Sequence, residues 1–397
     1  MDHQEIKLRK QLSEQLVGSP YFSDAEIYAV IDRLIQSNAG SVCLKERMRL
    51  RTTLFHSVRG LDILEELLAD DSVTEIMING PEQIFIERAG KITRWDNSFP
   101  SMERLEDVIR QIAGACNRTV NEQKPIADAR LQNGARVNIV LPPISLSGPV
   151  VTIRRFPDEP ISVQELIGWG SLTEEAAIFL KQLVGAGYTI LVGGGTSTGK
   201  TTLLNVLSGF IPETERIITI EDNAELQLQG NDNLVRLEAR SGNIEGENAI
   251  TLRDLIRTAL RMRPDRIIIG EVRGAEAGDW MTCLNTGHQG SLGSAHANSV
   301  KDMIGRLESM ILMGISLPIP VIRAQIASGI EILVHLKRDD AGQRRVDEIT
   351  EITGIADDRI LLNPIFKRDG RVMKTIAALN KDEKWRQYAR KTEGCTG

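Results

Sequence analysis

The ten residues from Gly193 to Thr202 constrain the fold of this chain more than any other stretch. From Gly194 they read Gly-Gly-Thr-Ser-Thr-Gly-Lys-Thr, the G-x-x-x-x-G-K-[ST] pattern of a phosphate-binding loop. A short apolar, β-rich run, Tyr188 to Val192, precedes the loop, and apolar residues at helical spacing follow it. The glycines let backbone N–H groups turn toward phosphate oxygens, and the start of the helix adds its positive end. The sequence therefore predicts a strand, a loop and a helix that bind a nucleotide.

Each part of the loop has an expected role. Lys200 can reach the outer phosphates, and the Thr201 hydroxyl can ligate Mg²⁺. Ser197 and Thr198 fill variable positions, so any positive backbone angle there would be adopted without glycine, at some strain. A Gly-rich turn that binds nothing is the alternative, and the register of strand, motif and helix argues against it. The expected nucleotide-binding residues are Gly194, Gly195, Thr196, Ser197, Thr198, Gly199, Lys200, Thr201 and Thr202.

Hydrolysis of a nucleotide also needs an acidic group for Mg²⁺ and a base that orients water. Two apolar runs end in carboxylates: Ile217 to Ile220 is followed by Glu221 and Asp222, and Arg266 to Gly270 is followed by Glu271. Charge at a strand end is also common simply because the end meets water. In a mostly parallel sheet, however, ligands lie at the carboxyl ends of the strands, so both acids are expected beside the loop.

Basic and imidazole groups are further candidates. Arg136, Arg154 and Arg155 could stabilise phosphate charge, in the same chain or across a subunit boundary, or could form a solvated basic strand end. His288 and His296 are the first and last residues of a nine-residue, Gly-rich stretch, and their spacing does not favour a metal site. They are either polar turn residues or groups that sense phosphate and relay protons, and spacing alone leaves both interpretations open.

The periodicity of the chain predicts several regions. Residues 1–57 are expected to be helical, as a docking arm or a packing cap, followed by an α+β domain at 58–157 and a linker at 158–170 marked by Pro157 and Pro160. An α/β domain is expected at 171–380, with antiparallel strands over 330–376, and a polar, frayed tail at 381–397. Capping boxes are expected at Ser23, Ser162 and Ser171. The expected helices are 61–68 and 105–113, with a third opened by Thr251; the expected strands are 74–78, 84–87, 127–131, 136–141, 150–154, 188–192, 216–220, 234–238 and 266–269.

Composition limits the functional classes. The 397 residues carry a net charge of −6, which argues against non-specific binding of nucleic acid. The four cysteines, Cys43, Cys116, Cys283 and Cys395, lie far apart and are expected to be reduced thiols. No apolar window is long enough to span a bilayer. These features predict a cytoplasmic protein that reaches a membrane only through a partner.

The order of four motifs resembles one known family. The loop is followed by the acidic box Ile218 to Asp222, then by Gly270-Glu271-Val272-Arg273, then by a histidine box through His288 and His296. This order is similar to that of the secretion ATPase superfamily, which includes type II and type IV secretion motors and type IV pilus motors. The segments Val73 to Pro81 and Arg136 to Pro143 resemble the CpaF/TadA branch, the motor of Tad pili.

The resemblance implies a RecA-like P-loop ATPase core of α/β class, preceded by an α+β, PAS-like domain and a helical segment. It implies a homohexamer that hydrolyses ATP with Mg²⁺ and moves pilin subunits through an inner-membrane platform protein, without direct contact to nucleic acid and without membrane insertion. It also assigns roles. Glu221 would orient or activate water, and Glu271 would hold Mg²⁺ partly through water. The remaining matched residues are Lys200 and Thr201 at phosphate and Mg²⁺, His288 and His296 in the histidine box, and Arg136, Arg154 and Arg155 reaching the nucleotide from the preceding domain.

Three alternatives are compatible with the sequence. The same core could drive a nucleic-acid motor, although no basic, aromatic-rich groove is evident. It could belong to a type IV secretion traffic ATPase that exports effectors, or to a scaffold that binds nucleotide without turnover. The chain also departs from the family pattern, because Ser197 replaces a common glycine and Gly293-Ser294-Ala295 replaces bulkier residues. Neither departure removes a group that does chemistry.

Overall fold

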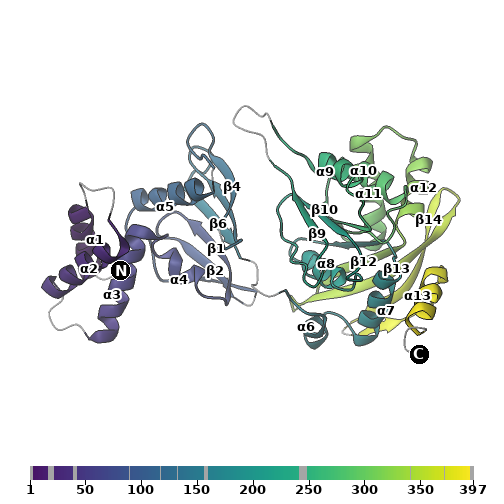
Figure 1. The fold of residues 1–397 in the computed structure, drawn as a ribbon, viewed down its shortest axis with the longest axis horizontal. Coiled ribbons are helices and arrows are strands. Elements are labelled where there is room, and N and C mark those ends of the chain that lie inside the picture. Colours follow the sequence, from purple (N-terminus) through teal and green to yellow (C-terminus); the bar gives the residue numbers. More distant parts are fainter. Residues whose placement is uncertain are drawn as a thin grey trace. The chain divides into compact units, whose positions relative to one another are not determined.

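The computed structural model describes residues 3–16, 22–38, 43–88, 90–116, 118–131, 133–155, 160–240, 248–339, 341–370 and 372–393. The chain divides into two compact units, Met1–Asp158 and Glu159–Gly397 (Figure 1). Pro157, one of the two prolines expected in the linker, lies outside the described residues.

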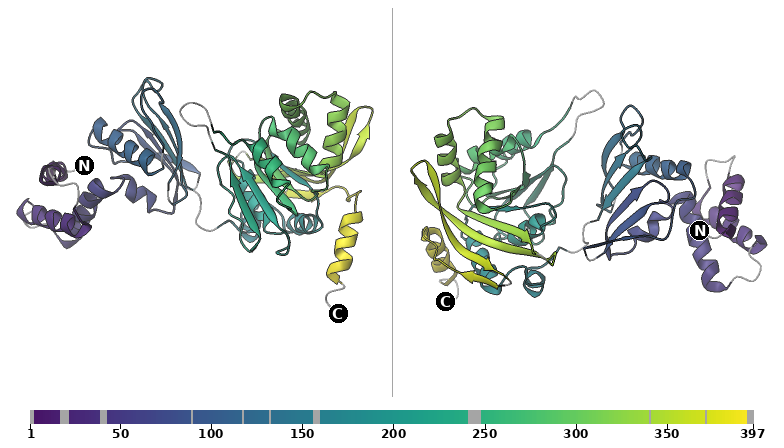
Figure 2. Two further views of the ribbon diagram at one scale, coloured as in Figure 1. Left: turned by 45° about the horizontal axis from the view of Figure 1, so that its top comes forward. Right: turned by 180° about the vertical axis from the view of Figure 1, so that it is seen from behind.

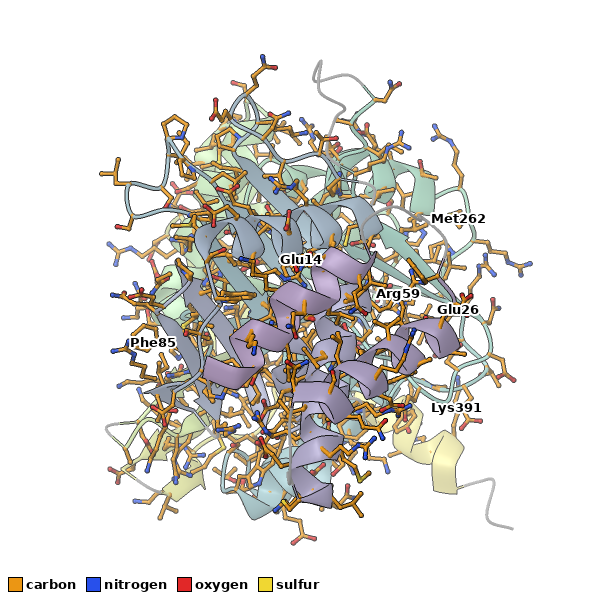
Figure 3. All side chains as sticks on the ribbon, turned by 90° about the vertical axis from the view of Figure 1, so that its left-hand side faces the viewer. Glu14, Glu26, Arg59, Phe85, Met262 and Lys391 are labelled. Atoms are coloured by element: carbon orange, nitrogen blue, oxygen red, sulfur yellow. The ribbon has the colours of Figure 1, made fainter. Side chains whose placement is uncertain are left out.

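Unit 1 begins with three packed helices, α1 (His3–Leu16), α2 (Asp24–Asn38) and α3 (Leu44–Arg59). The expected capping box is present, because Ser23 N–H donates to Glu26 Oε2 at 2.7 Å and Glu26 N–H donates to Ser23 Oγ at 3.3 Å. In Figure 3, Glu26 near the start of α2 and Arg59 at the end of α3 are labelled. The end of α3 is tied to the start of α2, since Arg59 Nε lies 3.3 Å from Asp24 Oδ1.

The rest of unit 1 is an antiparallel sheet with two helices on its apolar face, α4 (Leu64–Leu68) and α5 (Met102–Ala115). The strand order is β3-β2-β1-β6-β5-β4. The expected helix over 61–68 is shorter than predicted, and strand β3 was not predicted. The strands are β1 (Val73–Asn79), β2 (Ile84–Arg88), β3 (Lys91–Arg94), β4 (Ile126–Arg130), β5 (Arg136–Val140) and β6 (Val150–Arg154).

Unit 2 is a nine-stranded sheet between two layers of helices, in the order β15-β14-β13-β12-β7-β11-β10-β8-β9. The strands from β12 to β9 in that order run parallel, which confirms the α/β fold. Antiparallel strands β13 to β15 extend the same sheet. The strands are β7 (Ile190–Gly194), β8 (Ile217–Glu221), β9 (Leu234–Glu238), β10 (Arg266–Val272), β11 (Leu292–His296), β12 (Ile332–Arg338), β13 (Arg344–Ala356), β14 (Arg359–Asp369) and β15 (Val372–Thr375).

The helices of unit 2 lie on both faces of this sheet (Figures 1 and 2). Each face carries its own buried apolar cluster. One face is covered by α9 (Leu252–Ala259), α10 (Glu276–Leu284), α11 (Val300–Gly314) and α12 (Ile319–Gly329). The other face is covered by α6 (Val163–Gly168), α7 (Glu174–Gly185), α8 (Lys200–Ser208) and α13 (Glu383–Glu393). Helix α6 lies inside the region predicted as linker, and the expected capping box at Ser162 is present. The helix expected to open at Thr251 also begins with a capping box, which was not predicted.

Helices α11 and α12 form a bent apolar pair. Within the described ranges no single helix is both long and apolar enough to cross a bilayer, but this pair together meets the length and composition, with a bend of 116°. Its inner residues, among them Met303, Leu307 and Ile322, are buried in the core of unit 2.

Two sequence predictions in unit 2 are wrong. Ser171 does not cap the next helix. The cap is Thr173, whose side chain accepts from Ala176 N–H, because Ser171 is held by backbone pairing to Val346 and by its own bond to the Arg344 carbonyl. Residues 383–393 are not a frayed tail but helix α13, whose Trp385 Nε1 donates to Gln182 at 3.2 Å.

A buried carboxylate connects the C-terminal segment to the sheet. Glu351 is 1% exposed and accepts from Asn363 Nδ2 and from the backbone N–H groups of Asn380 and Lys381, at 2.7 to 2.9 Å. We expect Glu351→Leu to destabilise unit 2 by about 2–4 kcal/mol, because three partly buried donors lose their buried acceptor. Glu351→Gln, which keeps one acceptor oxygen, should lose less. Urea unfolding of both variants measures the difference, and equal losses would contradict this role.

Candidate active site

The phosphate-binding loop connects β7 to α8. Its turn contains two residues with positive φ, Ser197 at 55° and Gly199 at 95°. The strain expected for a non-glycine residue in this loop is therefore present at Ser197. Gly194 is required for a different reason, because a Cβ atom there would lie 2.7 Å from the Leu336 carbonyl oxygen. The Thr198 hydroxyl donates to the Gly195 carbonyl at 2.9 Å and closes the loop.

Lys200 is folded back onto the loop. Its Nζ donates to the carbonyls of Gly194 at 3.3 Å and Gly195 at 2.9 Å, and it lies 3.3 Å from Nδ1 of His296. The side chain is buried at the start of α8, where the helix dipole also favours an anion. An ammonium group that already faces the interior of the loop needs a small movement to contact a phosphate.

Four neighbouring strands bring the candidate groups to one edge of the sheet. Strands β7, β11, β10 and β8 lie side by side and parallel. At their carboxyl ends they carry, in that order, the phosphate loop, His296, Glu271 and Glu221. Glu221 and Glu271 thus lie at the same edge of the sheet as the loop, both on one side of β7, and their roles stay predictions. Strand β11 itself was missed by the sequence analysis, which treated Leu292 to His296 as part of a Gly-rich loop.

Glu221 is a buried carboxyl group at the end of β8. It is 3% exposed, and its Oε1 accepts from the backbone N–H groups of Glu225 and Leu226, each at 2.9 Å. Among the described residues, its Oε2 has no hydrogen-bond partner. Burial raises the pKa of Glu221 to about 7, against the lowering effect of the two backbone donors. A carboxyl group with a pKa near neutrality matches the requirement for a general base.

Gly270 on β10 provides the surface against which Glu221 packs. A Cβ atom at position 270 would lie 2.9 Å from Cγ and 3.2 Å from Oε1 of Glu221. In the sequence, Gly270 is noted only as part of the motif Gly270 to Arg273, and its contact with Glu221 was not predicted. A glycine directly before a strand-end acid was the available signal.

His296 lies between Lys200 and Glu271. Its Nε2 is 2.7 Å from Glu271 Oε1, although the two are not aligned as a hydrogen bond, and Oε1 is buried without a hydrogen-bond partner in the described part of the chain. Burial and the charge of Lys200 hold the pKa of His296 below its usual range, against the opposing effect of Glu271. The imidazole is therefore neutral near pH 7. Because an ammonium group can only donate, Nδ1 accepts from Lys200 and the ring proton resides on Nε2.

Arg273 adds positive charge next to Asp222 and Glu271. Its Nη2 pairs with Asp222 and lies 3.8 Å from Glu271 Oε2. These contacts link the end of β10 to the residue that follows β8.

His288 is not brought to this cluster within the chain. It precedes β11, while His296 ends that strand, and the register pairs Leu292 with Ile190 and His296 with Gly194. At about 3.3 Å per residue, the strand places His288 at the opposite edge of the sheet from the phosphate loop. The role expected for His288 at the nucleotide is thus not supported by its position in this unit.

The three arginines of unit 1 differ in their surroundings. Arg136 and Arg154 are paired across β5 and β6 on the face away from the apolar core. Arg155 is instead directed toward its own unit, where it donates to the carbonyls of Asp70 and Val73 and pairs with Asp71 at 3.0 Å. Arg155 therefore holds the turn before β1, while Arg136 and Arg154 remain candidates for a phosphate contact.

The donor set also fits Mg²⁺. Thr201 lies in the first turn of α8, and Glu271 lies near the end of β10, two strands from β7 in the sheet. The Oε1 atom of Glu271 is buried and accepts no hydrogen bond within the described ranges. Oxygen donors from one hydroxyl and one carboxylate suit an ion that keeps several waters and binds phosphate oxygens.

The fold and the site together define a nucleotide-binding protein with a RecA-like core. The family model for type II/IV secretion system proteins matches residues 58–378, and the chain belongs to this family. It is 34% identical over 327 residues to a putative conjugal transfer protein of Mycobacterium tuberculosis, covering 81% of this chain and 92% of that protein. It is 34% identical over 316 residues to the type IV secretion system protein PtlH of Bordetella pertussis, covering 73% and 93%.

Solved structures show the same fold at low sequence identity. The pilus retraction motor PilT with bound ADP is similar with a TM-score of 0.53 and 17% identity, covering 85% of this chain and 88% of that one. The ATPase DotB of Legionella pneumophila is similar with a TM-score of 0.51 and 20% identity, covering 76% and 82%. The predicted membership in the secretion ATPase superfamily is confirmed. These relatives do not single out the Tad branch, so the closeness to CpaF/TadA stays a prediction.

Proposed function

We propose that this chain is a motor ATPase that hydrolyses ATP with Mg²⁺ to drive pilus assembly or protein secretion. The observation that carries the proposal is the alignment of the phosphate loop, His296, Glu271 and Glu221 at the ends of four adjacent strands. This edge supplies a phosphate cradle, a neutral imidazole, an acid for Mg²⁺ and a base of suitable pKa. A scaffold that only binds nucleotide would not need a buried carboxylate with a pKa of about 7.

The proposed reaction is in-line attack of water on the terminal phosphate. Lys200 exchanges its loop carbonyls for phosphate oxygens as ATP enters, and the backbone donors of Glu225 and Leu226 hold Glu221 so that Oε2 receives the proton of the water. His296 contacts both Lys200 and Glu271 and so fixes the position of each relative to the other. Thr201 and Glu271 would hold Mg²⁺, which neutralises developing phosphate charge when bound. Arg136 and Arg154 would supply further positive charge, from the same chain or from a neighbouring copy.

We infer that the working form is a homohexamer at the cytoplasmic face of the inner membrane, where it engages a platform protein. The family membership supports this inference, and the substrate is either a pilin or a secreted protein. The 34% identity to a conjugal transfer protein and to PtlH gives weight to a second candidate, a traffic ATPase of a type IV secretion or conjugation system. Stimulation of turnover by single-stranded DNA at low salt would favour that candidate.

Steady-state ATP hydrolysis by the purified chain tests the enzyme proposal. We expect Mg²⁺-dependent turnover in a hexamer-sized fraction, and a loss of about 10²- to 10³-fold in Lys200→Ala, which removes a preorganised positive group from the phosphates. Lys181→Ala, at an exposed lysine on α7, is the matched control and should retain full activity. Near-normal turnover in Lys200→Ala would contradict the assignment.

A further inference from the structure

Arg338 on β12 contacts the phosphate loop. Strand β12 pairs with β7 so that Leu336 is opposite Gly194, and Arg338 therefore extends two residues beyond the end of β7. There its Nε donates to the carbonyl oxygen of Ser197 at 3.1 Å. Ser197 is the loop residue whose φ of 55° is unfavourable for a side chain with a Cβ atom.

The hydrogen bond from Arg338 orients the whole peptide group between Ser197 and Thr198, not only its carbonyl oxygen. The Ser197 carbonyl and the Thr198 N–H belong to the same trans peptide plane and point in opposite directions. An arginine that holds the carbonyl outward therefore turns the Thr198 N–H toward the interior of the loop, where backbone N–H groups bind phosphate. If Ser197 relaxed to a negative φ, this plane would rotate and the N–H would leave the cradle.

Arg338 is itself held in a stiff hairpin. Asp339 closes the β12–β13 turn, where its Oδ1 accepts from the backbone N–H of Ala341 at 3.0 Å and of Gln343 at 2.8 Å. Arg345 pairs with Asp339 at 2.7 Å and donates to the Gly170 carbonyl at 2.6 Å. The exposed side chain of Arg338 thus starts from a backbone position that the hairpin fixes.

We propose that Arg338 is a positioning residue for nucleotide binding, which holds Ser197 in the left-handed conformation that a glycine would adopt without help. The inference rests on the proposed nucleotide site and assigns no contact between Arg338 and the nucleotide. It explains how a serine is accommodated at a backbone angle that favours glycine.

The test compares ADP binding, in the presence of Mg²⁺, among five versions of the full chain. We expect Arg338→Met to weaken ADP binding about five- to tenfold, since one hydrogen bond from a charged group is lost. We expect the loss to be much smaller when residue 197 is glycine, so that Arg338→Met with Ser197→Gly binds nearly as well as Ser197→Gly alone. Lys337→Met, the neighbouring exposed lysine on the same hairpin, is the charge-matched control and should bind normally.

The outcomes separate this inference from the proposed function. A weak Arg338→Met variant that is rescued by Ser197→Gly supports the positioning role. Normal binding by Arg338→Met overturns it and leaves the proposed function standing. A weak variant that the glycine does not rescue also overturns it, because Arg338 would then act on the nucleotide directly. Failure of the natural chain to bind ADP would overturn both. Thermal unfolding of each variant shows whether unit 2 is intact. If unit 2 of the Arg338→Met variant is not folded, Arg338→Lys takes its place in the comparison.

Discussion

Glu221→Gln is expected to lower kcat for ATP hydrolysis by about 10²- to 10⁴-fold while ATP binding stays within about twofold. The glutamine keeps the oxygen that accepts from the N–H groups of Glu225 and Leu226, so the side chain stays in place. What it loses is the ability of the second oxygen to take a proton from water. Single-turnover hydrolysis and equilibrium nucleotide binding measure the two quantities separately.

Asp222→Asn is the matched control, since it removes a neighbouring carboxylate that is paired with Arg273. It should reduce turnover far less than Glu221→Gln does. Full turnover in Glu221→Gln would exclude Glu221 as the base. An equal loss in both variants would instead point to a general need for negative charge at the end of β8.

The pH dependence follows from the same group. With a pKa of about 7, Glu221 must be ionised to act, so kcat should fall about tenfold per pH unit below that value.

The contribution of Glu221 to the free energy of unfolding changes with pH in the opposite sense to kcat. Because the folded-state pKa is raised above the ordinary 4.5, the contribution of Glu221 to stability is complete below about pH 4.5 and is lost as the pH rises through about 7. Glu221→Gln should therefore raise the Tm at pH 8 and change it little at pH 5.

The sequence was sufficient where one local pattern determined the structure. A glycine-rich loop between an apolar strand and a helix has few alternatives, and the acids after two apolar runs had to lie at the same edge of a parallel sheet. The capping boxes at Ser23 and Ser162 formed for the same local reason.

The predictions failed where distant packing decides the structure. Strand β11 has low intrinsic β-propensity, but its Gly293 lies against Trp280, whose ring would be 2.8 Å from an added Cβ atom. The small residues are thus needed by a neighbouring helix, which no local pattern indicates. Helix α13 has a polar sequence. It is held by contacts of individual side chains with distant parts of the chain, such as that of Tyr388 with Gly185 on α7.

The separation of His288 from His296 also depends on structure that the spacing did not show. Once Leu292 to His296 forms a strand, the two imidazoles must lie at its opposite ends. If Leu292 to His296 formed a loop instead of a strand, the two imidazoles could lie close together. One missed strand therefore changed the expected composition of the site.

Gly270→Ala is expected to lower kcat by about 10- to 100-fold without affecting ATP binding. The added methyl group would lie 2.9 Å from Cγ of Glu221, so that side chain has to move. It cannot move far without losing the two backbone donors that hold Oε1, and a displacement of about 1 Å is enough to cost about 10²-fold in rate. Gly305→Ala is the control, because a Cβ atom there meets nothing within 4 Å and alanine favours the helix.

A double-mutant comparison separates this effect from general damage to the sheet. If the methyl group acts by moving Glu221, then Gly270→Ala should reduce kcat no further in a chain that already carries Glu221→Gln. Multiplicative losses in the double variant would mean that Gly270 acts on another part of the site, such as Glu271 on the same strand. Unchanged kcat in Gly270→Ala alone would mean that Glu221 and its two backbone donors shift together, and that the position of the base tolerates such a shift.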